Sequence, residues 1–492
     1  MKSNLRLPSS IARAVCGALA AAAILASAAA ASELSDDLRA RRARVMERLG
    51  PDTMLILWSA PVQRYSLDID YEYRQDSNLY YLTGLAQEGT MLVLMPGNVE
   101  RRDVLFIKDK DPAQEHWRGR TLTTDEARAR TGIETVLVNS QFEAFVASML
   151  GRQASAAVTA RDAARFFDAL SADRAHLALV YETSGAAEPM PMQFANKMRA
   201  RLSGFTTTNV TTVFDDLRTV KTPYERKVLV KSLEISSDAQ MAGMRAARPG
   251  VYEYEVKASI EAVHRGRGAV SWSYPSIVGS GPNATILHYP DSDRQLQDGD
   301  LLLVDAACNF GYMAGDITRT YPVNGRFSPA QKDVYRVVLQ AQEEGQKAAG
   351  KPGATLQDIH AATVDVIKSG LLKLGLITDA HGDQYRLWYT HGASHYIGID
   401  VHDVGNRARA IQPGMAFTIE PGIYIRQAAL DAMPRTPDNI AFIEHVQPAV
   451  RRYADIGVRI EDSYLVEDQG IVNLSAAVPK TIDAIEAFLR SK

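Results

Sequence analysis

Two stretches of this sequence follow the same plan and decide the fold: LQDGDLLLVD at residues 296–305 and IQPGMAFTIE at residues 411–420. In each stretch a turn leads into a short apolar run that ends in a carboxylate, which predicts a buried strand with an acid at its end. A second pair of similar segments, RPG at residues 248–250 and KPG at residues 351–353, closes two helical stretches. We therefore expect a duplicated domain whose two similar halves face each other across a site.

Three acidic residues stand where such strands end, and a fourth lies in a further strand-like segment. Asp305 and Glu420 end the two runs above, and Glu461 follows the run GVRI. Asp316 lies in AGDITRT at residues 314–320, which we predict to be a second strand that returns beside the first. Because an unpaired buried charge is costly, a positive group must meet these acids. Two divalent cations would balance the four carboxylates, as in a carboxylate-bridged two-metal centre.

Each acid alone also fits a surface carboxylate or an ion pair with a nearby arginine, such as Arg319 with Asp316 or Arg459 with Glu461. The histidines favour the metal site, because three of the ten histidines fall within twelve residues: His391, His395 and His402. A lone buried histidine is common, but a cluster that leads into Glu420 is not. The candidate metal ligands are therefore Asp305, Asp316, His395, Glu420 and Glu461.

Length and composition limit the remaining possibilities. A chain of 492 residues exceeds what one core normally spans, so two domains are expected. With 46% hydrophobic and 23% charged residues, the composition is that of a globular protein rather than a disordered or coiled-coil chain. The net charge of −3 gives no general attraction to nucleic acid or anionic lipid.

Residues 1–31 form a separate segment. Lys2, Arg6 and Arg13 precede an Ala-rich apolar run that ends in small residues, which predicts a secretory signal peptide cleaved near Ala31. A membrane anchor fits less well because the run is short and only mildly hydrophobic. We expect a bacterial protein that is periplasmic or secreted and has no membrane contact after cleavage.

The mature chain divides into two predicted domains. Residues 32–215 alternate helical stretches with short apolar runs, at residues 54–58, 91–95 and 104–107, that predict strands of an α/β domain. TPYE at residues 222–225 has an N-cap threonine, a proline at the first helical position and a glutamate three residues after the cap, which predicts a helix start. We place the boundary just before it, so that the second domain covers residues 216–492.

A family resemblance then becomes visible in six segments: DSNLYYLTG (76–84), IVGSG through LHY (277–289), GDITRT (315–320), HGASHYIGIDVHD (391–403), EPG (420–422) and GVRIED (457–462). Together they resemble the proline-specific pita-bread metallopeptidases, a family that includes aminopeptidase P and prolidase. The first segment resembles the creatinase-like N-terminal domain, so the resemblance covers nearly the whole mature chain. It implies an α/β (α+β) protein with a pita-bread catalytic domain that contains an internal pseudo-duplication.

The resemblance also implies an activity. It makes the five candidates the ligands of two divalent metal ions, with Asp316 and Glu461 bridging, and it places His288, His391, His402 and Arg459 in the catalytic site. Oxygen-rich ligands with one imidazole suit Mn²⁺, although Zn²⁺ and Co²⁺ also fit. The expected reaction is hydrolysis of the N-terminal Xaa-Pro bond of peptides through a hydroxide that bridges the two ions, with Glu420 as the proton acceptor. Homodimers or homotetramers are common in the family.

Two alternatives remain open at this point. The segment from Glu420 to Glu461 is longer than in compact bacterial aminopeptidases P and closer to prolidases, which cleave only dipeptides; it is a candidate lid or oligomer contact. A non-catalytic binding protein of the same fold is disfavoured because all five ligands are present. We favour the aminopeptidase because the short spacing from His395 to Glu420 and the GDITRT segment are closer to it.

Overall fold

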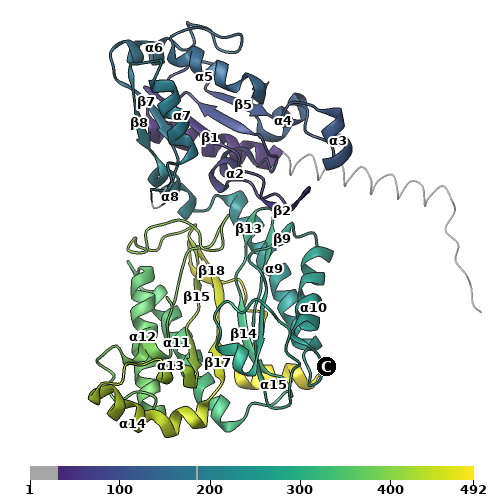
Figure 1. The fold of residues 1–492 in the computed structure, drawn as a ribbon, viewed down its shortest axis with the longest axis vertical. Coiled ribbons are helices and arrows are strands. Elements are labelled where there is room, and N and C mark those ends of the chain that lie inside the picture. The colour runs from purple at the N-terminus through teal and green to yellow at the C-terminus, as the bar shows by residue number, and fades with distance from the viewer. Residues whose placement is uncertain (1–31, 184, 186, 492) are drawn as a thin grey trace, which may run out of the picture. The chain divides into compact units, whose positions relative to one another are not determined.

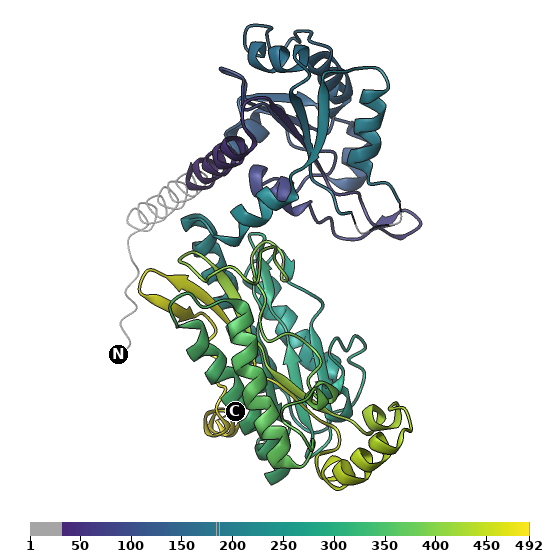
Figure 2. The same ribbon diagram turned by 90° about the vertical axis from the view of Figure 1, so that its left-hand side faces the viewer.

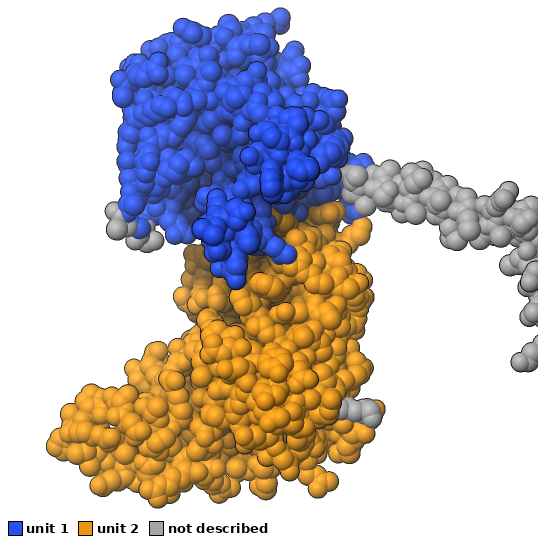
Figure 3. Space-filling view, turned by 45° about the vertical axis from the view of Figure 1, so that its right-hand side comes forward, with its two compact units in different colours: residues 1–217 blue, residues 218–492 orange. Residues whose placement is uncertain are grey.

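The computed structural model describes residues 32–183, 185 and 187–491. The predicted signal peptide therefore lies outside the described residues. The chain separates into two compact units, residues 1–217 and 218–492, which Figure 3 colours separately. This division falls two residues after the predicted boundary. None of the described helices is long and apolar enough to cross a membrane.

Unit 1 is an α/β domain built on one mixed sheet with the strand order β6-β5-β4-β1-β7-β8 (Figure 1). The strands are β1 (Thr53–Trp58), β4 (Met91–Leu94), β5 (Asp103–Ile107), β6 (Thr135–Val138), β7 (Ala175–Leu179) and β8 (Phe205–Asn209). A short hairpin, β2 (Arg64–Ser66) and β3 (Ile69–Asp70), lies outside this sheet. The three apolar runs predicted as strands are β1, β4 and β5, so that prediction is confirmed.

Helices surround this sheet because its strands carry apolar side chains on both faces. They comprise residues 32–49, α2 (Ser77–Thr83), α3 (Pro112–Arg118), α4 (Thr124–Thr131), α5 (Phe142–Leu150), α6 (Ala164–Ser171) and α7 (Met190–Arg199). On one face, Ile56 and Phe106 pack in a buried cluster with Phe142 of α5 and Phe166 of α6. The final helix, α8 (Thr211–Thr219), leads into unit 2.

Unit 2 uses one plan twice. Its first half begins with α9 (Pro223–Ala246) and α10 (Glu253–Gly266), followed by the antiparallel sheet of β10 (Ile277–Ser280), β11 (Leu301–Asp305) and β14 (Thr318–Pro322). Its second half begins with α11 (Pro329–Ala349) and α12 (Leu356–Leu374), which lie side by side in green in Figure 2. The sheet of β15 (Ala416–Ile419), β18 (Asp462–Glu467) and β19 (Gly470–Asn473) and the pair β16 (Gly422–Ile425) and β17 (Ile456–Arg459) follow.

Local sequence signals set the helix ends in both halves. Thr222 caps α9 in a capping box with Glu225, as predicted, and Ser328 caps α11 in the same way. Gly250 and Gly353, the last residues of the repeated RPG and KPG segments, have φ values of +92° and +74°. Glycine adopts this left-handed backbone without a steric penalty, so both helical segments can turn toward the next element.

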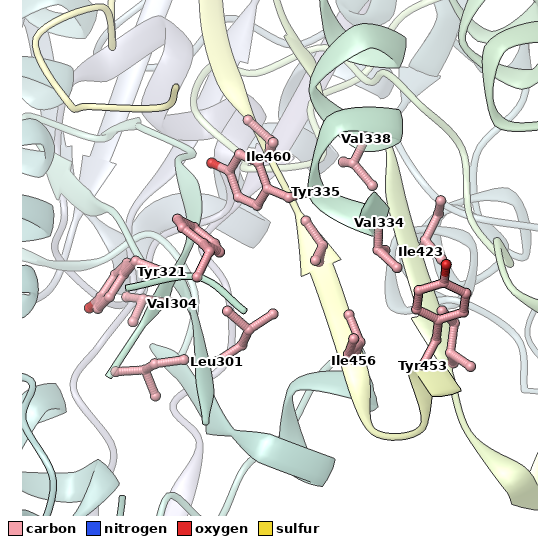
Figure 4. Packing of buried hydrophobic residues seen from close by; sticks show 14 of the residues in the cluster. Leu301, Val304, Tyr321, Val334, Tyr335, Val338, Ile423, Tyr453, Ile456 and Ile460 are labelled. Carbon is pink, nitrogen blue, oxygen red and sulfur yellow. The ribbon is translucent and has the colours of Figure 1, made fainter. Parts of the chain in front are cut away.

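A shared apolar core joins the two halves, as Figure 4 shows. Strands of both halves and α11 contribute buried side chains to it: Leu301, Val304 and Tyr321 from the first half, Val334, Tyr335 and Val338 from α11, and Ile423, Ile456 and Ile460 from the second half. The segment between Glu420 and Glu461 adds α13 (Gln427–Asp431) and α14 (Pro437–Tyr453). Because Val446, Val450 and Tyr453 of α14 belong to the same core, this long segment is a packed part of unit 2.

A buried polar cluster fixes the start of β18. The Asp462 carboxylate accepts hydrogen bonds from Arg319 (2.7 Å), Lys480 (2.6 Å) and Gln342 (2.9 Å). Burial opposes its ionisation, but Arg319 and Lys480 outweigh that effect and lower the pKa of Asp462. The pairing of Arg319 with Asp316 considered from the sequence is wrong, because side chains alternate along β14 and Arg319 points away from the face of its neighbour Thr318. The cluster therefore holds the strand that follows Glu461.

Candidate metal centre

The nine residues predicted from the sequence line a single cavity of about 570 Å³ in unit 2. They are Asp305, Asp316, His395, Glu420, Glu461, His288, His391, His402 and Arg459. They come from both halves of the unit and from positions 173 residues apart (461 − 288). The fold therefore brings together the residues that the motifs selected.

Glu420 and Glu461 lie where two antiparallel ladders break. β15 pairs with β18 as far as Ile419, and the ladder of β16 and β17 begins at Gly422, so Glu420 falls between them. Glu461 falls at the facing break, between the end of β17 and the start of β18. Since side chains alternate along an extended chain, Glu461 and Arg459 share one face, and both line the cavity.

Asp305 and Asp316 supply the acids of the first half. Asp305 is the last residue of β11, as predicted. The predicted second strand that returns beside the first is confirmed, because β14 pairs antiparallel with β11. Asp316 itself lies just before this strand, in the irregular segment between β13 (Met313–Ala314) and β14, so its predicted place inside the strand is wrong. At this point the chain leaves one small sheet and joins another, so Asp316 belongs to neither ladder. Tyr274 Oη lies within hydrogen-bond distance of both carboxylates, 2.6 Å from Asp316 Oδ1.

His395 has the geometry of a metal ligand. Its Nδ1 is 3.0 Å from the carbonyl oxygen of Tyr396, so Nδ1 carries the hydrogen and donates it there. Its Nε2 is then an acceptor and faces Asp316 Oδ2 and Glu420 Oε1, each at 3.4 Å. Atoms of Asp316, His395 and Glu461 also lie within 4.8 Å of one another, a spacing that suits a shared cation.

The buried carboxylates of the cavity repel one another, and a positive charge would stabilise their ionised form. Burial, followed by repulsion from Asp305, raises the pKa of Asp316 to about 8. Burial and neighbouring acids likewise raise the pKa values of Glu420 and Glu461 well above their usual range. A divalent cation would remove this repulsion and keep the carboxylates ionised. Four carboxylates and one imidazole therefore fit divalent metal ions by both their chemistry and their charge.

A chain of hydrogen bonds links Arg459 to His391. Arg459 Nη1 donates to Tyr424 Oη (2.9 Å), Tyr424 donates to His391 Nε2 (2.8 Å), and His391 Nδ1 donates to the carbonyl oxygen of Gly392 (2.8 Å). Burial, with a smaller effect of Arg459, lowers the pKa of His391 to about 3, so its ring is neutral. Arg459 Nη2 also donates to Asp305 Oδ2 (2.6 Å), which replaces the pairing with Glu461 considered from the sequence.

His288 and His402 keep their ring nitrogens free. Within the described part of the chain neither ring makes a hydrogen bond, although His402 packs edge-on against His395 with 4.3 Å between ring centroids. Desolvation, then His395 and His288, lowers the pKa of His402 to about 4. The next residue, Asp403, fixes the loop through Lys221 Nζ (2.8 Å) and Arg218 Nη2 (2.5 Å). The two free imidazoles can therefore contact a substrate.

Several residues of the site carry no motif that would select them from the sequence. Tyr274 binds two of the acids, Tyr424 links Arg459 to His391, and Arg407 lines the cavity as a further cation. The pairing of β16 with β17 brings Tyr424 near Arg459, whereas Tyr274 and Arg407 lie outside the strands and are revealed only by the three-dimensional structure. Of the aromatic residues near the motifs, Tyr289 lines the cavity, whereas Trp388 and Tyr396 are buried in hydrophobic clusters.

Comparison with known proteins covers both units. Residues 227–468 match the family described as Metallopeptidase family M24, and residues 38–158 match Aminopeptidase P, N-terminal domain. The chain is 32% identical to the Xaa-Pro aminopeptidase of Escherichia coli (strain K12) over 477 residues, which cover 93% of this chain and 98% of that protein. It is 30% identical to Xaa-Pro aminopeptidase 3 of Homo sapiens, over 89% of this chain and 81% of that protein.

Solved structures agree with this assignment. The aminopeptidase PepP of Pseudomonas aeruginosa aligns with a TM-score of 0.78 at 32% identity, over 93% of this chain and 98% of that one. Aminopeptidase P of Escherichia coli with the inhibitor Pro-Leu aligns with a TM-score of 0.77 at 31% identity, over the same shares. These similarities confirm the predicted pita-bread catalytic domain and its α/β N-terminal partner. The chain therefore belongs to metallopeptidase family M24, among the members that carry the aminopeptidase P N-terminal domain.

Proposed function

We propose that this protein is an Xaa-Pro aminopeptidase, which removes the N-terminal residue from peptides with proline in second position. One observation carries the proposal: five metal-ligating side chains converge in one cavity of a chain that resembles Xaa-Pro aminopeptidases over nearly its whole length. The prolidase alternative is not favoured, because relatives matched over 97–98% of their own length are named Xaa-Pro aminopeptidases. A binding protein without turnover would not need all five donors.

Two divalent ions complete the proposed site. Asp305, Asp316, His395, Glu420 and Glu461 would hold them, and the family resemblance gives Asp316 and Glu461 the bridging role. When bound, such ions polarise the scissile carbonyl and lower the pKa of a water molecule. Mn²⁺ is our preferred metal because the donors are mainly carboxylates, and Zn²⁺ and Co²⁺ also fit. A Zn-substituted form of the Escherichia coli enzyme is among the similar structures.

The protein's own side chains have distinct tasks in this proposal. Glu420 accepts the proton of the attacking water, because its carboxylate already faces the metal-binding imidazole at 3.4 Å. His402, with both ring nitrogens free, donates to the oxyanion of the tetrahedral intermediate, and His288 contacts the substrate. Both ring nitrogens of His391 are hydrogen-bonded within the protein. Its contact with the substrate is therefore made by the face or edge of the ring rather than by a hydrogen bond. Arg459 orients Asp305 and Tyr424.

Proline recognition follows from the shape of the substrate. An Xaa-Pro bond has no N–H and its ring fixes φ, so a site that binds an extended peptide through that donor handles it poorly. This cavity offers an apolar wall instead, to which Pro275, Ile277, Leu287, Tyr289 and Pro290 contribute. Its walls suit a pyrrolidine ring, and the carboxylates at its base suit the free N-terminal amine.

We also propose that the enzyme is exported to the periplasm or secreted, and that it assembles as a homodimer or homotetramer. Export is supported by the basic and Ala-rich residues 1–31. Assembly is supported by the frequency of homodimers and homotetramers in the family that the sequence resembles. Peptides, rather than nucleic acid or membrane lipid, are the partners that the net charge of −3 and the cavity favour.

The metal-free protein should become less stable as the pH rises. The folded state raises the pKa of Asp316 from its ordinary 3.8 to about 8, so the folded protein binds this proton more tightly than the unfolded chain. The contribution of Asp316 to the stability of the metal-free protein is therefore fully present below pH 4 and is lost as the pH rises toward 8. Bound metal removes this dependence, so the melting temperature with Mn²⁺ should exceed that with a chelator by more at pH 8 than at pH 5. An equal difference in melting temperature at all pH values would contradict the proposal. Asp383→Asn, which removes a carboxylate at an exposed position, is the control and should keep the pH dependence of the wild-type protein.

His395→Ala and His402→Ala should both lose activity, but for different reasons. Loss of His395 removes a donor, so bound metal should fall together with activity. Loss of His402 leaves the metal in place and lowers kcat by about 10²-fold or more, because its role is confined to the transition state. Metal analysis and steady-state kinetics separate the two. His445, exposed on α14 and outside the cavity, supplies the matched control; equal metal loss in both variants would mean that the two roles are misassigned.

Substrate length should separate the aminopeptidase from a dipeptidase. We expect release of the N-terminal residue from Xaa-Pro peptides of three or more residues, because a dipeptidase must close the site around the proline carboxylate. The measurement is kcat/KM for an Xaa-Pro dipeptide, an Xaa-Pro-Yaa-Zaa peptide and an Xaa-Ala-Yaa-Zaa control. Cleavage of the dipeptide alone would identify a prolidase, and efficient cleavage of the Ala control would remove the proline specificity.

A further inference from the structure

A second cavity of about 400 Å³ adjoins the metal-binding cavity. Both cavities are lined by Leu287 and His288, so these two residues form the boundary that the cavities share. The second cavity is completed by Thr285, Ile286, Leu387, Trp388, Thr390, Tyr424 and Arg426. Ile286 leaves 42% of its surface exposed there, whereas Trp388 is fully buried. The cavity is therefore an open apolar depression beside the site of hydrolysis.

Arg426 gives this cavity a positive charge. Among its lining residues there is no acid, and Arg426 is the only permanently charged side chain. Among the described residues Arg426 makes no ion pair or side-chain hydrogen bond, whereas Arg459 in the adjoining cavity is paired with Asp305. A cation without a partner beside an apolar wall complements a carboxylate on a flexible apolar chain.

The position of Arg426 is set by the same strand that follows the metal ligand Glu420. Arg426 directly continues β16 and has extended backbone angles, with φ −138° and ψ 135°. Since side chains alternate along an extended chain, Arg426 and Tyr424 lie on one face, and both line the second cavity. Ile423 and Ile425 lie on the other face, in the core. The backbone of Arg426 is thus fixed by the strand that follows Glu420, and the residue is exposed.

We propose that the second cavity is a subsite for a carboxylate carried by the peptide beyond its proline, with Arg426 as the recognising group. The inference rests on the proposed function. The substrate's free amine is drawn to the acids of the metal centre, so the rest of the peptide must leave that cavity. A chain that advances about 3.3 Å per residue carries its third and fourth residues beyond the reacting bond. The carboxylate is either the C-terminus of a short peptide or an acidic side chain.

Four peptides separate the two sources of the carboxylate. Ala-Pro-Ala-Ala amide has none, Ala-Pro-Ala-Ala with a free C-terminus has one at its end, and Ala-Pro-Asp-Ala amide has one in a side chain. Ala-Pro-Asn-Ala amide is the neutral match of the third. The wild-type enzyme should cleave at least one acidic peptide with a kcat/KM about 2- to 5-fold above its neutral match, the range for one exposed ion pair. The difference should lie in KM and shrink with added salt.

Variants at Arg426 decide the proposal. Arg426→Ala should abolish the preference and leave the neutral amides within about 2-fold of wild type, and Arg426→Glu should reverse it. Arg435→Ala, which removes an exposed arginine of the same segment outside both cavities, should keep the preference. A wild-type enzyme without preference, or a preference that survives Arg426→Ala, would overturn the subsite. Failure to cleave any Xaa-Pro peptide would instead overturn the proposed function.

Discussion

Mutual repulsion among four carboxylates in one cavity is the constraint that the rest of unit 2 must satisfy. Asp316 and Glu461 are almost fully buried, at 4% and 1% exposure, and Asp305 is little more accessible. Among the described residues, Arg459 is the buried arginine that donates a hydrogen bond to one of these four acids, and it donates to Asp305. Asp316 and Glu420 face the imidazole of His395, each at 3.4 Å. Such an arrangement is costly without cations and favourable with them.

In the duplicated fold, acidic residues of the cavity lie at positions where strands leave a ladder. Asp316 lies where the chain passes between two small sheets, and Glu420 and Glu461 lie at facing breaks in the second half. A side chain at such a break is anchored by strands on both sides. Arg459 and Asp462, on either side of Glu461, point to opposite faces and are each held by buried hydrogen bonds. The placement of Glu461 therefore rests on the alternation of side chains along the chain from β17 to β18.

The sequence predicted the ligands better than their partners. Asp305 and Glu420 were predictable because each directly follows or ends an apolar run, which is a local pattern in the sequence. The spacing of the histidines selected His395. The strand assigned to Asp316 was wrong because the sharp passage between two sheets leaves no mark in the order of apolar residues. The partners of Arg319 and Arg459 were missed for another reason. Arg319 and Asp462 lie 143 positions apart (462 − 319) and on strands of different sheets, so packing between sheets brings them together, and no local spacing encodes it. Tyr274 and Tyr424 were missed because their partners, Asp316 and Arg459, are likewise distant in the sequence.

The central claim is that these five side chains hold two divalent ions, and metal stoichiometry tests it most directly. Titration of Mn²⁺ into metal-free protein in a calorimeter, with the metal content of the product measured independently, counts the bound ions. The account predicts two ions per chain in the wild-type protein and a reduced number in Glu461→Gln, because Glu461 is one of three residues whose ligand atoms lie within 4.8 Å of one another. Saturation at one ion per chain, or two ions bound unchanged in Glu461→Gln, would contradict it.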